Sequence, residues 1–275
     1  MVAFALLAAA AASAQAPRLY YEMDGEGTHL VLIEEGGHDT SSWFLLLPDL
    51  RERHRVIRYD LRGQGRSEPA ADGEYSPAAH RRDLERILDG LDVGSAHLVG
   101  VGRGARIAIE AARARPDRVR SLVLIQPRLE DSADEHAWWS RLAVAWERVG
   151  EPSFGEYSSV LVQRWIGSRF ATLHPWVPPF YDLMLRRQDA APLAASLRGW
   201  LLAEPPDAGV IRGVPTLVAV GEDGRSPSAS LARTVATASR VRIEDSRWPI
   251  VDAPRELVDA LTRFLAGVDE RRPAP

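Results

Sequence analysis

The chain has 275 residues, of which 45% are hydrophobic and 26% are charged, and its formal net charge at pH 7 is -4. This length suits a single α/β domain with an insertion, and the composition is that of a globular protein. So small a negative charge provides no field that would attract nucleic acid, which excludes nucleic-acid binding as the main role. The absence of cysteine excludes disulfides, thiolate metal ligands and thiol nucleophiles.

The first sixteen residues are typical of a segment outside the fold. Residues 2–7 and the alanine run after them are too short to span a bilayer, and residues 12–14 have the small-x-small pattern of a cleavage site. A signal peptide usually has a Lys or Arg before its apolar run, and none is present here. We expect either a signal peptide cleaved after Ala14, with export to the periplasm or the medium, or an extra alanine-rich helix or misassigned start on a cytoplasmic protein.

Strand and helix patterns alternate along the chain from residue 19. Short apolar runs predict strands at residues 19–23, 30–33, 56–60, 97–99, 118–125, 214–221 and 241–245. A helix is expected from Pro77 to Gly90 with Ser76 as its N-cap, and further helices over residues 104–114 and 254–265. Such alternation favours a mostly parallel, doubly wound sheet with helices on both faces and a pocket at the carboxyl ends of the strands.

Residues 97–110 combine a buried strand, a sharp glycine turn and a helix. This stretch resembles the nucleophile elbow of the α/β-hydrolase family, Gly-x-Ser-x-Gly, in which the serine stands at the tip. Gly100 and Gly104 match the two outer glycines, but Gly102 occupies the tip. The resemblance therefore implies the fold, but the sequence lacks the usual nucleophile of that family.

Residues 60–67 match the family's Asp-x-Arg-Gly-x-Gly-x-Ser loop at every position that the pattern fixes. We expect Asp60 and Arg62 to hold this loop by a charge-assisted hydrogen bond. Such a role is structural, so the loop indicates the fold and leaves the activity open.

Between residues 126 and 209 the alternation stops, and six of the eight tryptophans lie there. The resemblance implies a helical cap of residues 126–209, a core of residues 17–125 and 210–266, and a tail of residues 267–275. The cap aromatics predict a lid over a hydrophobic or aromatic ligand, or else simply form the core of the cap. They are Trp138, Trp139, Trp146, Phe154, Tyr157, Trp165, Phe170, Trp176, Phe180, Tyr181 and Trp200.

The other two triad positions of the family also carry different residues. The position of the acid falls on Gly224, with Asp223 one residue earlier, and Arg247 stands where the family has its base. No histidine follows His174, so a shifted alignment cannot supply that base. Loss of a triad costs on the order of 10⁶ in kcat, which argues against ordinary covalent hydrolysis.

Charged residues take the place of the triad. Glu35 stands where the family has the histidine of its oxyanion loop, and we expect it to form an ion pair with Arg247 over Gly102. This pair either plugs the site or contacts a ligand, Arg247 then holding a carboxylate or enolate with help from the Arg103 N–H. Glu35 or His38 could serve as a general base or acid, although His38 also fits a solvent-facing loop. We interpret His29, His54, His80 and His97 as structural.

The sequence thus predicts an α/β-hydrolase-type sheet with a helical cap and a degenerate site. The main hypothesis is a non-hydrolytic pseudoenzyme that binds a small hydrophobic or aromatic molecule. The alternatives are a lyase, isomerase or cyclase that uses acid-base chemistry, with Asp39 as a further candidate, and a hydrolase with displaced catalytic residues. No metal or cofactor is expected, because the required ligand spacings and dinucleotide fingerprint are missing. The candidate catalytic residues are Glu35, His38, Asp223 and Arg247, and the candidate ligand-binding residues are Gly36, Gly37, Gly102, Arg103, Trp138, Trp139 and Trp248.

Overall fold

One mostly parallel sheet organises the fold. A computed structural model describes residues 16–129, 131–149, 160–163, 166, 168–204, 211, 213–221, 238–244, 246 and 248–271. The described strands form a seven-stranded sheet in the order β1-β3-β2-β4-β5-β6-β7, in which β1 runs antiparallel to β3 and the other neighbours are parallel. The predicted sheet is therefore confirmed. The strands are β1 (Tyr21–Asp24), β2 (Thr28–Ile33), β3 (His54–Tyr59), β4 (Ala96–Val101), β5 (Val119–Ile125), β6 (Thr216–Val220) and β7 (Ser239–Arg242).

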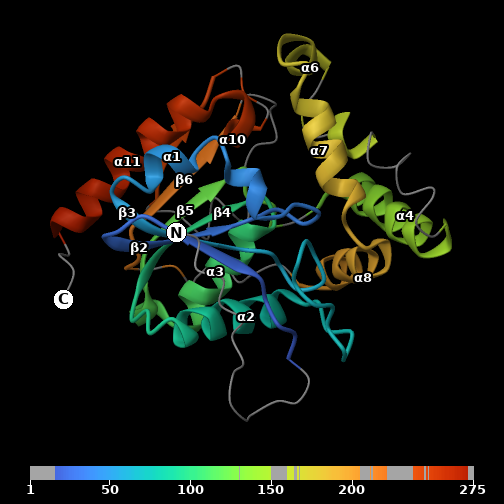
Figure 1. Ribbon diagram of the computed structural model, residues 1–275, viewed down its shortest axis with the longest axis horizontal. Coiled ribbons are helices and arrows are strands. Elements are labelled where there is room, and N and C mark those ends of the chain that lie inside the picture. Colours follow the sequence, from blue (N-terminus) through green and yellow to red (C-terminus); the bar gives the residue numbers. More distant parts are fainter. Residues whose placement is uncertain are drawn as a thin grey trace.

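Helices cover both faces of this sheet (Figure 1). Leu30 and Leu32 of β2 belong to the core that includes residues of α1 and α11, whereas Val31 and Ile33 belong to the core that includes residues of α2 and α3. Such alternation is expected for a parallel sheet buried on both sides. The elements outside the insertion are η1 (Thr40–Trp43), α1 (Leu47–Leu50), α2 (Pro77–Gly90), α3 (Gly104–Ala114), η2 (Pro116–Arg118), α10 (Pro249–Asp252) and α11 (Pro254–Arg271).

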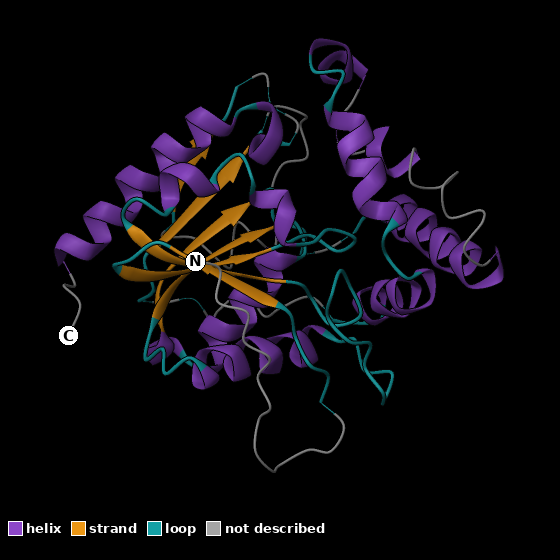
Figure 2. Cartoon of the chain, viewed as in Figure 1, coloured by secondary structure: helices purple, strands orange, loops and turns teal. Residues whose placement is uncertain are grey.

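A helical insertion lies between β5 and β6, on one side of the sheet (Figure 2). It contains α4 (Ala133–Val149), α6 (Ser168–Leu173), α7 (Val177–Arg186) and α8 (Ala190–Leu201), and α4 packs against α8. Three of the predicted cap aromatics and all but the last of the sixteen residues of the proposed leader lie outside the described residues. Within the described part of the chain, no helix has the length and apolarity to cross a membrane.

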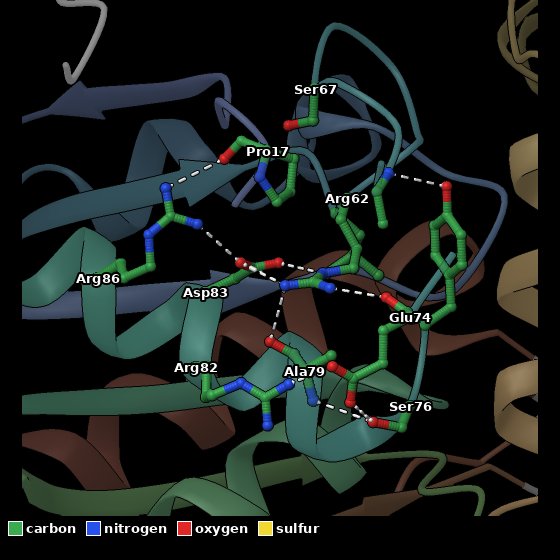
Figure 3. A network of polar contacts seen from close by, with 12 residues as sticks. Pro17, Arg62, Ser67, Glu74, Ser76, Ala79, Arg82, Asp83 and Arg86 are labelled. Atoms are coloured by element: carbon green, nitrogen blue, oxygen red, sulfur yellow. Dashed lines mark hydrogen bonds and ion pairs between the residues drawn. The ribbon is translucent and has the colours of Figure 1, made fainter. Parts of the chain in front are cut away.

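The loop after β3 is held by two separate sets of contacts. Asp60 accepts hydrogen bonds from the backbone N–H groups of Thr40 and Arg66, at 2.7 and 2.8 Å. Arg62 instead donates to both carboxylate oxygens of Asp83 on α2, at 2.6 and 2.8 Å (Figure 3). The expected bond between Asp60 and Arg62 is therefore corrected, because each finds its partner in another segment of the chain.

The Arg62 guanidinium is at the centre of a buried polar network. It also donates to the backbone carbonyls of Glu74 and Ala79, at 2.6 and 3.2 Å, so that it ties the loop to the start of α2 (Figure 3). Asp83 is 1% exposed, and Arg86 contacts the same carboxylate at 3.2 Å. Ser76 caps α2 by accepting from the Ala79 N–H, as its sequence position predicts.

Candidate active site at the glycine elbow

The turn between β4 and α3 leaves no room for a side chain at its tip. Gly102 has a φ of +55°, a conformation in which glycine carries little strain. A Cβ atom built on Gly102 would lie 1.5 Å from Oε2 of Glu35. The Glu35 carboxylate therefore fills the space into which a side chain at position 102 would project.

Glu35 is anchored at this position by Arg103. Its Oε2 accepts a hydrogen bond of 2.8 Å from the Arg103 backbone N–H, and its Oε1 lies 3.6 Å from the Arg103 Nε. Glu35 is 3% exposed, and burial raises the pKa of its carboxyl group above the ordinary 4.5, although Arg103 and Arg128 oppose the rise. The elbow thus holds a buried carboxylate of increased basicity.

A tight turn after β2 fixes the backbone of Glu35. The His38 N–H donates to the Glu35 carbonyl at 3.2 Å, and Gly37 within this turn has a φ of +88°. The Gly37 N–H donates to Oε1 of Gln64, at 2.6 Å, which ties the turn to the loop after β3. These contacts position Glu35 above the elbow.

His38 lies in an aromatic pocket, so its interpretation as a solvent-facing loop residue is wrong. The side chain is fully buried, with its ring centroid 5.2 Å from that of Tyr181 and 5.9 Å from that of Trp248. Burial lowers the pKa of His38 to about 3. His38 is therefore neutral at physiological pH.

His38 should make the fold sensitive to acid. Its pKa is depressed in the folded state, so its contribution to stability is complete above the unfolded pKa of 6.5 and is lost as the pH falls towards 3. We expect His38→Phe to reduce the loss of unfolding free energy between pH 7 and pH 5 by about 2 kcal/mol, measured by urea denaturation at both values. The exposed His174→Phe serves as the control, and an unchanged difference in His38→Phe would contradict the assignment.

A cavity of about 20 Å³ adjoins the Glu35 carboxylate, which is room for about one water molecule. Its walls come from the core on one side and from the helical insertion on the other, so the insertion covers the elbow. They are formed by Glu35, Gly36, Gly37, Arg103, Trp139, Trp146, Leu161, Leu193, Ser196, Leu197 and Trp200.

The structure brings most of the predicted site residues together. Six of them gather at the elbow: Glu35, Gly36, Gly37, Gly102, Arg103 and Trp139. Trp248 packs against His38. The Trp138 ring packs edge-on against that of Trp139, with 4.6 Å between the ring centroids, and Trp138 does not line the cavity beside Glu35. Asp223 and Arg247 lie outside the described residues, so the ion pair between Glu35 and Arg247 stays a prediction.

The elbow is also bordered by residues that the sequence did not single out as ligand contacts, among them Arg106 and Trp200. Arg106 follows Arg103 by three positions on α3, and this spacing places both on one face of a helix. That signal was readable in the sequence. Trp200 was grouped with the other cap aromatics, with no pattern to distinguish it.

A Ser-His-Asp arrangement does occur, but near the amino-terminal ends of β4 and β5, away from the elbow. Nδ1 of His97 lies 2.7 Å from Oγ of Ser121, and its Nε2 lies 3.0 Å from Oδ1 of Asp269. His97 and Ser121 are fully buried, and burial lowers the pKa of His97 to about 4. Because Ser121 is out of reach of a substrate, this arrangement links β4, β5 and α11 structurally. Among the described residues, no cluster of three or more His, Asp or Glu side chains could hold a metal ion.

Comparisons with known proteins agree with this architecture. The family described as alpha/beta hydrolase fold matches residues 28–201. The chain is 40% identical over 107 residues to RutD of Azorhizobium caulinodans, a carbamate hydrolase by name, over 39% of this chain and 40% of the relative. It is 32% identical over 170 residues to the pimeloyl-(acyl-carrier protein) methyl ester esterase of Methylococcus capsulatus, over 61% of each. The chain thus spans about two fifths and three fifths of the lengths of these relatives.

Solved structures match over nearly the whole chain. The enol-lactonase from Burkholderia xenovorans has a TM-score of 0.82 at 24% identity, with 91% of this chain and 97% of the other covered. A thermophilic esterase from Thermogutta terrifontis has a TM-score of 0.81 at 26% identity, with 92% and 94% covered. These matches establish the arrangement of the sheet and its helices.

Proposed function

This chain belongs to the α/β-hydrolase fold family, and on that premise we propose that it hydrolyses a small ester or lactone with the Glu35 carboxylate as its reacting group. The observation that carries this proposal is the place of Glu35, whose Oε2 lies where a side chain at the elbow tip would begin. The named relatives include a carbamate hydrolase, an esterase and an enol-lactonase. Their reactions all cleave an acyl carbon from oxygen or nitrogen, which supports a hydrolytic reading over the pseudoenzyme hypothesis.

Glu35 would act as a general base towards water. The carboxylate takes one proton from a water molecule in the adjoining cavity while the water oxygen bonds to the carbonyl carbon of the substrate. The carbonyl electron pair moves to its oxygen, and the Arg103 guanidinium supplies the positive charge near that oxyanion. When the acyl C–O bond breaks, Glu35 returns the proton to the leaving oxygen, so that an ester and water yield an acid and an alcohol.

The environment of Glu35 suits this role. A general base is most effective when its pKa lies near the working pH, and burial raises the pKa of Glu35 in that direction. His38 contacts Tyr181 and Trp248 and is neutral, so it would supply no proton at pH 7. Asp39 caps η1 by accepting from the Ser41 N–H, which gives it a structural use.

A second candidate is ligand binding without turnover. It is favoured by the contacts of Arg103 to both oxygens of Glu35 and by the small volume beside them. In this case the carboxylate would be a structural plug, and a second cavity of about 310 Å³, also lined by Arg103, would be the functional one.

The test compares the wild type with Glu35→Gln on p-nitrophenyl acetate, p-nitrophenyl butyrate and a γ-lactone. The amide keeps the shape of the side chain and cannot take a proton, so kcat/KM should fall by about 10²- to 10⁴-fold while the melting temperature is retained. The exposed Glu52→Gln is the matched control and should keep full activity. A wild type no faster than buffer, or a Glu35→Gln variant of undiminished activity, would refute the proposal.

A further inference from the structure

A larger cavity opens beside the elbow and is lined by three arginines. Its volume is about 310 Å³, within the range of small-molecule sites. Arg103 and Trp200 line both this cavity and the small one next to Glu35. The other lining residues are Arg106, Arg128, Leu129, Asp131, His136, Leu201 and Ala203.

Two of the three guanidinium groups already have carboxylate partners. Arg103 lies 3.3 Å from Asp131 and 3.6 Å from Glu35. Arg128 lies 3.9 Å from Asp131 and 3.5 Å from Glu135. The positive charges of these two side chains are therefore balanced by the protein itself.

Arg106 is different, because no carboxylate of the described residues lies within 4 Å of it. It is 5% exposed, and its Nη2 donates to the backbone carbonyl of Glu204. Its Nε is buried without a hydrogen-bond partner among the described residues, and Glu110 on the same helix contacts Arg113. A guanidinium has five N–H donors, and the buried Nε of Arg106 is one that no hydrogen bond from the described residues satisfies. A buried charge in this state is costly unless something pairs with it.

The rest of the wall combines four apolar residues with Asp131 and His136, and a tryptophan outside the wall holds two of the arginines in place. The Trp139 ring lies 5.2 Å from the Arg103 guanidinium and 5.3 Å from that of Arg128, so cation-π contacts fix both arginines. Trp200, Leu129, Leu201 and Ala203 provide the apolar surface. A ligand suited to this cavity therefore combines one negative charge with a hydrophobic body.

We propose that this cavity binds a small organic monocarboxylate and that the Arg106 guanidinium pairs with its carboxylate group. Planar carboxylates match the fork of a guanidinium, and Arg106 is the one guanidinium of these three with no carboxylate of the described residues within 4 Å, which favours a ligand with a single acidic group. The inference goes beyond ester hydrolysis and does not depend on it, because Glu35 does not line this cavity and Arg103 lies between the two sites.

Isothermal titration calorimetry with 3-phenylpropionate tests this site on the full chain. Wild type should bind the acid at least tenfold more tightly than the neutral 3-phenylpropionamide, and it should bind phenyl phosphate no more tightly than the acid. Arg106→Met should weaken binding of the acid by about 10- to 100-fold, the loss expected for a charged hydrogen-bonded pair. Arg113→Met, an exposed arginine of the same helix, should bind as the wild type does.

Folding and catalysis are separated from this result by design. Arg106→Met replaces a buried charge that has no carboxylate contact among the described residues by an apolar chain of similar length, so its melting temperature should not fall. Arg106→Lys provides a second variant that keeps the charge and loses the fork. The titrations are repeated in Glu35→Gln. Loss of hydrolysis with retained binding of the acid would support both proposals and show that the binding site does not depend on Glu35. Equal affinity for the acid and the amide, or for wild type and Arg106→Met, would overturn the site.

Discussion

Replacing Gly102 by alanine should destabilise the protein by about 3 kcal/mol, at the upper end of ordinary single substitutions. The new Cβ would lie 1.5 Å from Oε2 and 2.7 Å from Cδ of Glu35, so the carboxylate would have to leave its hydrogen bond with Arg103. The φ of +55° adds a smaller strain of about 1 kcal/mol for a residue with a Cβ. Thermal unfolding should show a melting temperature lower by about 10 °C.

Two further variants isolate the clash from the backbone strain. Gly73→Ala also sits at a positive φ, +69°, but its Cβ would meet nothing within 4 Å, so it measures the strain alone. In a Glu35→Ala background the blocking carboxylate is absent, so adding Gly102→Ala there should cost only that strain. If Gly102→Ala costs no more than Gly73→Ala, the Glu35 carboxylate does not occupy the elbow as described.

Arg62→Met should lower the free energy of unfolding by about 3 to 5 kcal/mol. The substitution leaves the carboxylate of Asp83, which is 1% exposed, without its main partner, and it removes the bonds to the carbonyls of Glu74 and Ala79. Urea denaturation at pH 7 measures the loss. We expect this loss because the buried carboxylate of Asp83 is left without a compensating charge, and not because the ion pair with Arg62 is itself strongly stabilising.

A reversal experiment tests that cause. Combining Arg62→Met with Asp83→Leu replaces the whole pair by apolar groups, and most of the stability should return. Arg82→Met on the same helix removes an exposed pair with Glu74 and should cost less than about 1 kcal/mol. A double variant as unstable as Arg62→Met alone would show that the carbonyl contacts, and not the charge of Asp83, dominate.

Local signals explain why much of the fold could be predicted. Ser76, Pro77 and Gly90 mark the two ends of α2, which runs over Pro77–Gly90, because caps and proline act within a few residues. The predicted strands overlap β1 to β7 to within a few residues, since apolar runs of that length fit buried strands. The glycine elbow was recognisable for the same reason, as a turn defined by neighbouring residues.

The partners of charged side chains could not be predicted in the same way. Arg62 pairs with Asp83 across 21 positions, and Glu35 receives its hydrogen bond from Arg103 across 68 positions. Which side chains meet at such distances depends on how the elements pack. The cavity beside Arg106 is also a product of packing, since its walls come from α3, the loop after β5, α4 and the end of α8. A sequence pattern alone cannot supply such a surface.

Two polar contacts at the start of the central strands depend on Asp269, which lies close to the C-terminal end of the chain. This residue, in the last turn of α11, bonds to His97 on β4 and to Arg120 on β5, which precede it by 172 and 149 positions. The two partners are buried, and contacts of such long range form late because the intervening chain must first be ordered. During synthesis, β4 and β5 therefore emerge long before the carboxylate that completes their polar contacts. A nascent chain released before residue 269 would leave His97 and Arg120 without these bonds to Asp269.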